Sequence, residues 1–358
     1  MPLRDGEAVE GKDGVRGRGT RLAGLARLLD SFLLPLVLIS AGLGFALPSP
    51  GRRLDANGAI LITLAVLVFC TGTSVTFADI SGLRAASRRI MLVLAVTSVT
   101  LPVLAWLASR LVSDPMPRSG VLAAGVAPVE VASVAFTGLA GGEVAIAAGL
   151  LVASTLLTVL LAGPVLALLG AHSATSQSGL LLTLVLAVAL PMAAGCGLRS
   201  IHPFGGRERP LIEILGIASL LVLLWEVASG LRLHAGDGLV AVALLAYLGG
   251  AGVLGYLLAL GAPSARRSAV ILPTAMRDFA VAAGIAATAF GIAAAAPLGI
   301  YGVMVLVFGA VAVQASRRGW RMGGEQIPSR HDRVLASGPA DRGSHRYGQG
   351  NPDKHEVT

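Results

Sequence analysis

An arginine and an aspartate stand side by side in the middle of an apolar segment, ILPTAMRDFAVAAG. They are Arg277 and Asp278, which follow Pro273 by four and five residues. A charged side chain in the hydrocarbon of a bilayer costs about 2.5–3.5 kcal/mol on insertion scales, so we expect both to face a cavity or a protein partner. Proline removes an N–H and disrupts the preceding helical turn, and the unwound backbone could then bind a solute. A structural salt bridge to another part of the chain is the alternative role.

A third charged residue lies in a similar setting, in the stretch PVEVAS, where Glu130 follows Pro128. If the two interruptions cross, Glu130 and Arg277 are plausible partners. A buried carboxyl group is also a candidate proton carrier. Pro128, Glu130, Arg277 and Asp278 are therefore the first candidates for a substrate-binding or ion-binding site.

Hydroxyl groups near the two interruptions could add oxygen ligands for an ion or a substrate. Ser133, Thr137 and Thr274 complete the candidate site, and Ser154 and Thr155 lie further along the chain. Each of these residue types is also common at contacts between membrane helices.

No cofactor or metal site is expected from the sequence. The six His residues fall in loops or tails without ligand spacing, and both cysteines lie inside apolar segments. Motifs of nucleotide-binding, hydrolytic and zinc enzymes are missing from the sequence, so we expect no enzymatic activity. Na⁺ or H⁺ remains a candidate as a coupling ion.

The composition places these residues in a membrane protein. Hydrophobic residues make up 54% of the 358 and charged residues 13%, whereas a soluble domain carries about 25% charged residues. Ten apolar runs are each long enough to cross about 30 Å of hydrocarbon as a helix. They are Ser31–Leu47, Gly58–Ala78, Ile90–Val112, Gly120–Ala140, Val144–Leu169, Gly179–Leu198, Pro210–Leu231, Gly238–Leu260, Ser268–Phe290 and Ala295–Ala315.

Lys and Arg residues gather in the two tails and in the loops after the second, fourth, sixth and eighth spans. This distribution predicts that both termini are cytoplasmic, in the plasma membrane. It does not form a nucleic-acid-binding stripe, so lipid and a small solute are the expected partners. The terminal segments 1–29 and 322–358 are expected to be disordered. Glu226, near the end of the seventh span, is expected to anchor that span at the membrane interface.

The fourth and ninth spans are interrupted at corresponding points when Pro128 is placed over Pro273. Two halves of five spans, residues 30–170 and 178–315, have opposite topology because five is odd. The sequence thus predicts an all-α fold of ten transmembrane helices in two inverted repeats, with broken helices crossing in a core domain. Broken helices that meet near the midplane are typical of secondary transporters.

Three stretches resemble the bile acid:sodium symporter family, whose wider superfamily includes arsenite exporters. They are FADISGLRAASRRIMLVLAVTSVTLPVLAW, GVAPVEVASVAFTGLAGGEVAIAAGLLVASTLL and AMRDFAVAAGIAATAFG. The resemblance implies a panel domain of spans 1, 2, 6 and 7, a core domain of the other six, and sodium-coupled transport of an organic anion by alternating access.

The chain departs from this family at most of the positions expected to bind sodium. Val134 stands at the Asn position of the fourth span, Ala147 and Leu151 at hydroxyl positions of the fifth, and Pro273 at the acidic position of the ninth. Thr97 stands at the Gln position of the third span. The resulting hypotheses are a sodium-coupled organic anion transporter, a proton-coupled exporter of a metalloid or organic anion that uses Glu130 or Asp278, and a non-transporting membrane sensor or scaffold.

Overall fold

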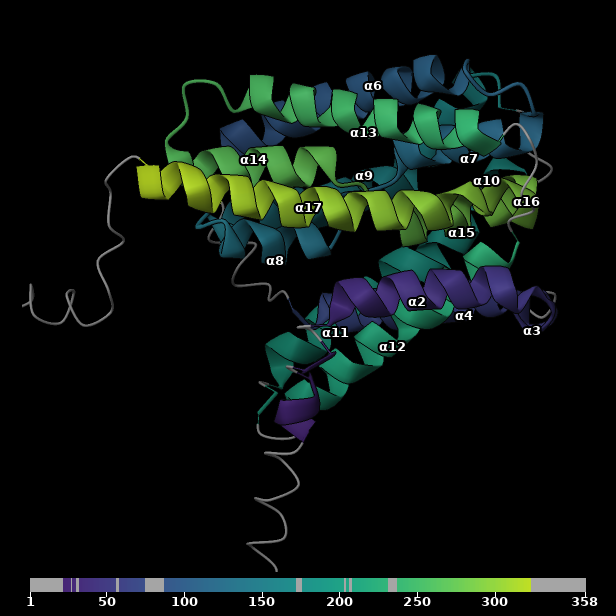
Figure 1. The fold of residues 1–358 in the computed structure, drawn as a ribbon, viewed down its shortest axis with the longest axis horizontal. Helices are drawn as coiled ribbons and strands as arrows, with labels where there is room; N and C mark the ends of the chain where they lie inside the picture. The colour runs from purple at the N-terminus through teal and green to yellow at the C-terminus, as the bar shows by residue number, and fades with distance from the viewer. Residues whose placement is uncertain are drawn as a thin grey trace, which may run out of the picture. The chain divides into compact units, whose positions relative to one another are not determined.

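The computed structural model describes residues 22–26, 28–29, 32–55, 58–74, 87–171, 176–202, 204–205, 208–230 and 237–322. Within these ranges the regular secondary structure is helical except for one isolated β-bridge (Figure 1). The helices are α2 (Leu33–Ala46), α3 (Pro48–Asp55), α4 (Ala59–Gly72), α6 (Ser87–Ser109), α7 (Pro115–Val126), α8 (Ala132–Leu139), α9 (Val144–Leu168), α10 (Gln177–Leu184), the π-helical turn η2 (Val185–Ala189), α11 (Leu190–Ile201), α12 (Glu208–Ser229), α13 (Asp237–Leu258), α14 (Ser264–Ala275), α15 (Phe279–Phe290), α16 (Ile292–Ala295) and α17 (Pro297–Met322).

Six helical segments in the described part of the chain are long and apolar enough to cross a membrane. They are Arg88–Ser109, Val144–Leu168, Gln177–Ile201, Glu208–Ser229, Gly238–Leu258 and Ile292–Ser316. Shorter apolar helices cover Pro35–Ala46, Ala59–Gly72 and Phe279–Phe290. The chain is therefore an α-helical integral membrane protein.

The fourth and ninth expected spans are each divided into two shorter helices. Residues 120–140 fall on α7 and α8, and residues 268–290 fall on α14 and α15. Each half is too short to cross about 30 Å of hydrocarbon alone. The unwound residues between the halves therefore lie partway along each span.

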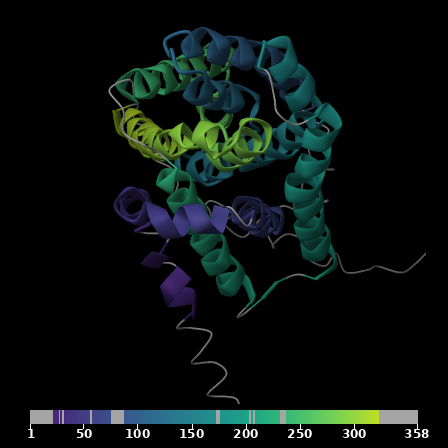
Figure 2. The same cartoon turned by 90° about the vertical axis from the view of Figure 1, so that its right-hand side faces the viewer.

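One group of packed helices consists of α2, α3, α4, α11 and α12, in which α12 contacts α2, α3 and α4 (Figure 2). Helices α4 and α11 approach closely because a glycine lies at their contact. A Cβ atom at Gly195 would lie 3.0 Å from the backbone nitrogen of Thr73 and 3.1 Å from the carbonyl carbon of Gly72. Small residues at such contacts let membrane helices pack backbone to backbone.

A second group contains the divided spans. Helix α13 packs against α6 and α14, α7 packs against α6 and α15, and α9 packs against α8 and α14 (Figure 1). Glycines of α17 face aromatic rings of this group: a Cβ at Gly302 would lie 2.8 Å from the ring of Phe279. These helices surround both unwound segments and position the candidate site.

The terminal segments are only partly described. Residues 22–26 and 28–29, within the expected N-terminal segment 1–29, are helical. Helix α17 continues to Met322, beyond the expected end of the last span at Ala315. The remaining residues of segments 1–29 and 322–358 lie outside the described part.

Candidate functional site

The first interruption follows from Pro128. The residue before a proline is disfavoured in the α conformation, and Ala127 is extended, with φ −65° and ψ 153°. Helix α7 therefore ends at Val126, and α8 starts at Ala132 after the unwound residues 127–131. The amide of Val129 in this segment donates a hydrogen bond to Ser154 Oγ of α9, at 3.0 Å.

The second interruption lies a few residues after the proline that the sequence singled out. Pro273 is inside α14, which continues to Ala275, and Met276 is extended, with φ −87° and ψ 108°. The new helix α15 starts after Asp278, whose Oδ1 accepts hydrogen bonds from the amides of Ala280 and Val281 at 2.9 Å each. The break thus lies where an aspartate can cap the next helix, three residues beyond Pro273.

The two unwound segments cross and pair with each other as a minimal antiparallel β-bridge between Val129 and Arg277. The amide of Glu130 donates to the carbonyl of Met276 at 2.9 Å, and the amide of Asp278 donates to the carbonyl of Pro128 at 2.8 Å. Each break therefore satisfies backbone groups that the other leaves open, as a bilayer requires.

This bridge relates the two breaks by a local two-fold axis that differs from the sequence alignment. Because Val129 is opposite Arg277, Glu130 is equivalent to Asp278, whereas placing Pro128 over Pro273 aligned Ser133 with Asp278. The prolines gave the wrong register because α14 continues beyond Pro273 while α7 ends before Pro128.

Arg277 lies at the centre of the crossing and is only 7% exposed. Its Nη2 donates a hydrogen bond to the carbonyl oxygen of Ala127, the residue that follows the last turn of α7. Within the part of the chain that the structure describes, no ion pair joins Arg277 to Glu130 or Asp278. Neither the expected Glu130–Arg277 pair nor a salt bridge between the adjacent residues is formed.

The two carboxylates differ in how their oxygens are bonded. Asp278 is 5% exposed and its Oδ1 caps α15 through two amides. Glu130 is 6% exposed, and its Oε1 accepts a single long hydrogen bond, 3.4 Å, from the amide of Ala132. Its Oε2 has no hydrogen-bond partner among the described residues. Asp278 thus caps α15 through one oxygen, and Glu130 has a fully buried oxygen that could take a proton or a ligand.

The three predicted hydroxyl residues are buried on α8 and α14, two helices that contact each other. Ser133 and Thr137 lie on α8, where Thr137 Oγ1 donates to the carbonyl of Ser133 at 2.7 Å, and Thr274 lies in the last turn of α14. The oxygens Ser133 Oγ and Thr274 Oγ1 are buried and have no hydrogen-bond partner among the described residues. Both can still contribute to a binding site.

A small cavity of about 30 Å³ adjoins Arg277. Polar lining comes from Thr97 and Ser98 of α6 and from Ser154 and Thr158 of α9. A site for one water needs roughly 10–15 Å³ by this kind of measure, so the cavity has room for one or two waters or a small ion.

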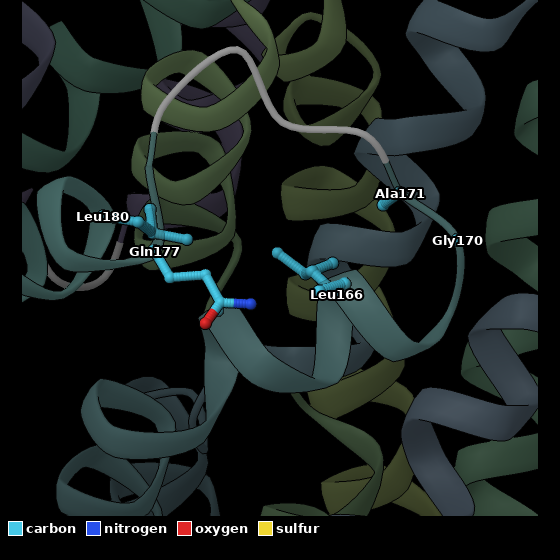
Figure 3. Close-up of a pocket in the computed structure, with 7 residues that line it drawn as sticks. Leu166, Gly170, Ala171, Gln177 and Leu180 are labelled. Carbon is cyan, nitrogen blue, oxygen red and sulfur yellow. The ribbon is translucent and has the colours of Figure 1, made fainter.

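A larger cavity, of about 240 Å³, lies elsewhere, between the end of α9 and the start of α10 (Figure 3). Leu166 and Leu180 face it from these two helices, and Gln177 supplies the only polar side chain among its seven described lining residues. It lacks the charged and convergent polar groups that orient a ligand, so we place the candidate site at the crossing.

Sequence reasoning missed two tyrosines beside the crossing. Tyr247 of α13 and Tyr301 of α17 are fully buried, and their ring centroids are 5.9 Å apart. Both lie close enough to Arg277 to interact with it electrostatically, and the Tyr247 hydroxyl donates to the carbonyl of Ala124 at 3.1 Å. The sequence feature that could have identified them is that each is a tyrosine inside an otherwise apolar span.

Glu226 lies three residues before the end of α12 at Ser229 and is only 1% exposed. Its role as an anchor at the membrane interface stays a prediction.

The chain matches the model of the Sodium Bile acid symporter family over residues 61–235. The match covers the first break, α9 and the helices that follow as far as α12, and it confirms the family resemblance of the sequence motifs. No curated protein matches the chain.

Proposed function

We propose that this chain, a membrane transporter of the sodium bile acid symporter family, moves a small organic anion across the plasma membrane by alternating access. Ten spans in two inverted five-span repeats, with both termini cytoplasmic, are part of the proposal. The presence of one divided span in each half, α7–α8 in the first and α14–α15 in the second, supports the inverted repeat.

One observation carries the proposal. Two unwound segments cross inside the packed helices, and the helices α8 and α15 begin there with unoccupied polar groups close by. Discontinuous helices of this kind form the binding sites of many secondary transporters. The charge of Arg277 provides attraction for an anion, whereas the N-termini of α15 and α8 already have the carboxylates of Asp278 and Glu130 beside them.

The family resemblance implies sodium as the coupling ion, but a specific observation favours protons as the second candidate. Glu130 Oε2 is buried without a hydrogen-bond partner among the described residues, which is where a transported proton could bind. In this alternative the chain is a proton-coupled exporter of a metalloid or an organic anion. The metalloid has less support, since Cys70 and Cys196 lie on α4 and α11 and not at the crossing.

The test is uptake of radiolabelled anions by proteoliposomes containing the full chain. A panel of carboxylates and sulfonates is first screened for compounds that raise the melting temperature of the purified protein. We expect uptake of a stabilising anion, and we expect it to fall at least tenfold in Ser133→Ala and Glu130→Gln.

Glu213→Gln is the matched control, because Glu213 is half exposed and pairs with Arg209 on the surface of α12. Uptake that is equal in the wild type and the Ser133→Ala and Glu130→Gln variants would contradict the proposed site. If no anion in the panel stabilises the protein or enters the vesicles, the organic anion is the wrong substrate class.

A further inference from the structure

The Arg277 guanidinium lies at the end of a helix. Its Nη2 bonds to the carbonyl oxygen of Ala127 at the C-terminal end of α7. The last carbonyls of a helix have no partner within the helix and lie at the negative end of its dipole. In discontinuous transporter helices, such ends and the unwound carbonyls beside them bind the coupling cation. Arg277 places a covalently attached positive charge there.

Four of the thirteen residues that line the cavity beside Arg277 carry hydroxyl groups, and the others, apart from Arg277, are apolar. Thr97 Oγ1 and Ser98 Oγ both donate their protons to the carbonyl of Leu94, at 3.2 and 2.6 Å. Ser154 Oγ donates to the carbonyl of Leu151 and Thr158 Oγ1 to the carbonyl of Val126, each at 3.0 Å. Because these protons are used elsewhere, the hydroxyl oxygens can act towards a ligand only as acceptors, and Ser154 Oγ already accepts one hydrogen bond from the amide of Val129. Lone pairs attract a cation and repel an anion.

In this conformation the cavity also has no room for an organic solute. Its volume is about 30 Å³, whereas small-molecule sites usually measure roughly 300–1,000 Å³. A small positive group is what fits both the size and the acceptor lining. Arg277 contributes to the lining of this cavity, and its Nε has no hydrogen-bond partner among the described residues.

We propose that Arg277 is a tethered cation that takes the place of the coupling cation, so that the protein neither binds nor requires sodium. Arginine stays protonated throughout the physiological range, and therefore the site is permanently filled. If the chain is a transporter, as proposed above, its transport would then be driven by protons or by exchange of one solute for another, and not by sodium. This consequence rests on the proposed function. The occupancy of the site does not depend on that function.

The experiment measures the melting temperature of the purified full chain in NaCl, KCl and choline chloride at equal ionic strength. We expect the wild type to melt within about 1 °C in all three salts. Arg277→Met removes the charge and leaves the acceptors, so we expect sodium to raise its melting temperature by roughly 5 °C near 100 times Kd. Arg277→Lys keeps a tethered charge and should remain insensitive. Arg209→Met is the control, because that side chain is 73% exposed.

Stabilisation of the wild type by sodium over both other salts would overturn the proposal. So would an Arg277→Met variant that folds and shows no response to sodium. If Arg277→Met does not fold, equilibrium dialysis of the wild type and Arg277→Lys with ²²Na⁺ decides: stoichiometric binding overturns the proposal, and its absence from both supports it. The melting temperatures and the sodium-binding measurement need no transported substrate. They can therefore support or overturn the role of Arg277 even if the protein turns out not to transport an organic anion.

Discussion

The hydrogen bond from the Val129 amide to Ser154 Oγ can be used to measure how much helix α9 contributes to the stability of the first break. It is 3.0 Å long and buried, so the substitution Ser154→Ala leaves the buried Val129 N–H without its protein partner. An unsatisfied buried donor costs about 1–3 kcal/mol. At roughly 2 °C per kcal/mol for a chain of this size, the melting temperature should fall by about 2–6 °C.

The neighbouring residue on the same helix provides the control. Thr155 Oγ1 donates to the carbonyl of Leu151 at 2.8 Å, as Ser154 Oγ does at 3.0 Å, but among the described residues no backbone group of the crossing bonds to it. Thr155→Val removes that hydroxyl at nearly constant volume and should cost under about 1 kcal/mol, because the carbonyl is already bonded within α9.

The assay combines thermal unfolding in detergent, followed by tryptophan fluorescence, with hydrogen exchange of the peptide that contains residues 127–131. We expect Ser154→Ala to melt lower and to exchange faster in that peptide, and Thr155→Val to do neither. Equal losses in the two variants, or an unchanged exchange rate at residues 127–131, would refute the reasoning that α9 satisfies the backbone of the first break.

Three further predictions concern other parts of the molecule. Asp278→Ala should cost about 2 kcal/mol through loss of the cap of α15, whereas Asp278→Asn, which can still accept both amides, should cost less than half as much in the same melting assay. Glu130→Gln should abolish any dependence of anion uptake on an imposed pH gradient, whereas Glu213→Gln should preserve it; a gradient effect that survives in Glu130→Gln would exclude Glu130 as the proton carrier. Gly195→Ala should destabilise the packing of α4 on α11 by about 1–3 kcal/mol, whereas Gly197→Ala, where a Cβ would meet open space, should be neutral or stabilising; equal melting temperatures would show that the α4–α11 contact can relax.

Hydrophobic runs predicted where the membrane helices lie, because burial in lipid demands an apolar surface regardless of tertiary contacts. The rarity of charge in such runs singled out Glu130, Arg277 and Asp278, and the structure brings all three to one crossing. Both signals are local in the sequence, and for that reason they can be read without a structure.

The pairing of these residues could not be predicted in the same way. Which group Arg277 bonds to depends on the backbone angles of Met276 and Asp278, and these put its guanidinium on the carbonyl of Ala127 rather than on Glu130. Tyr247 and Tyr301 reach the site from helices distant in the sequence. A contact between helices that are far apart in the sequence produces no periodicity or spacing from which it could be predicted.

The bridge between Val129 and Arg277 has a consequence for the order in which the protein is made. A stretch of 150 residues separates Ala127 from Arg277, which is roughly 8–30 s of synthesis at 5–20 residues per second. Throughout that interval the first break is in the membrane without the strand that completes it, and its open amide and carbonyl groups cannot be left in lipid. The nascent half must therefore be sheltered by water or by the insertion machinery until the second half emerges. The crossing is in this sense completed late in biogenesis, and any mutation that delays α14 prolongs the exposure of a segment that is itself unchanged.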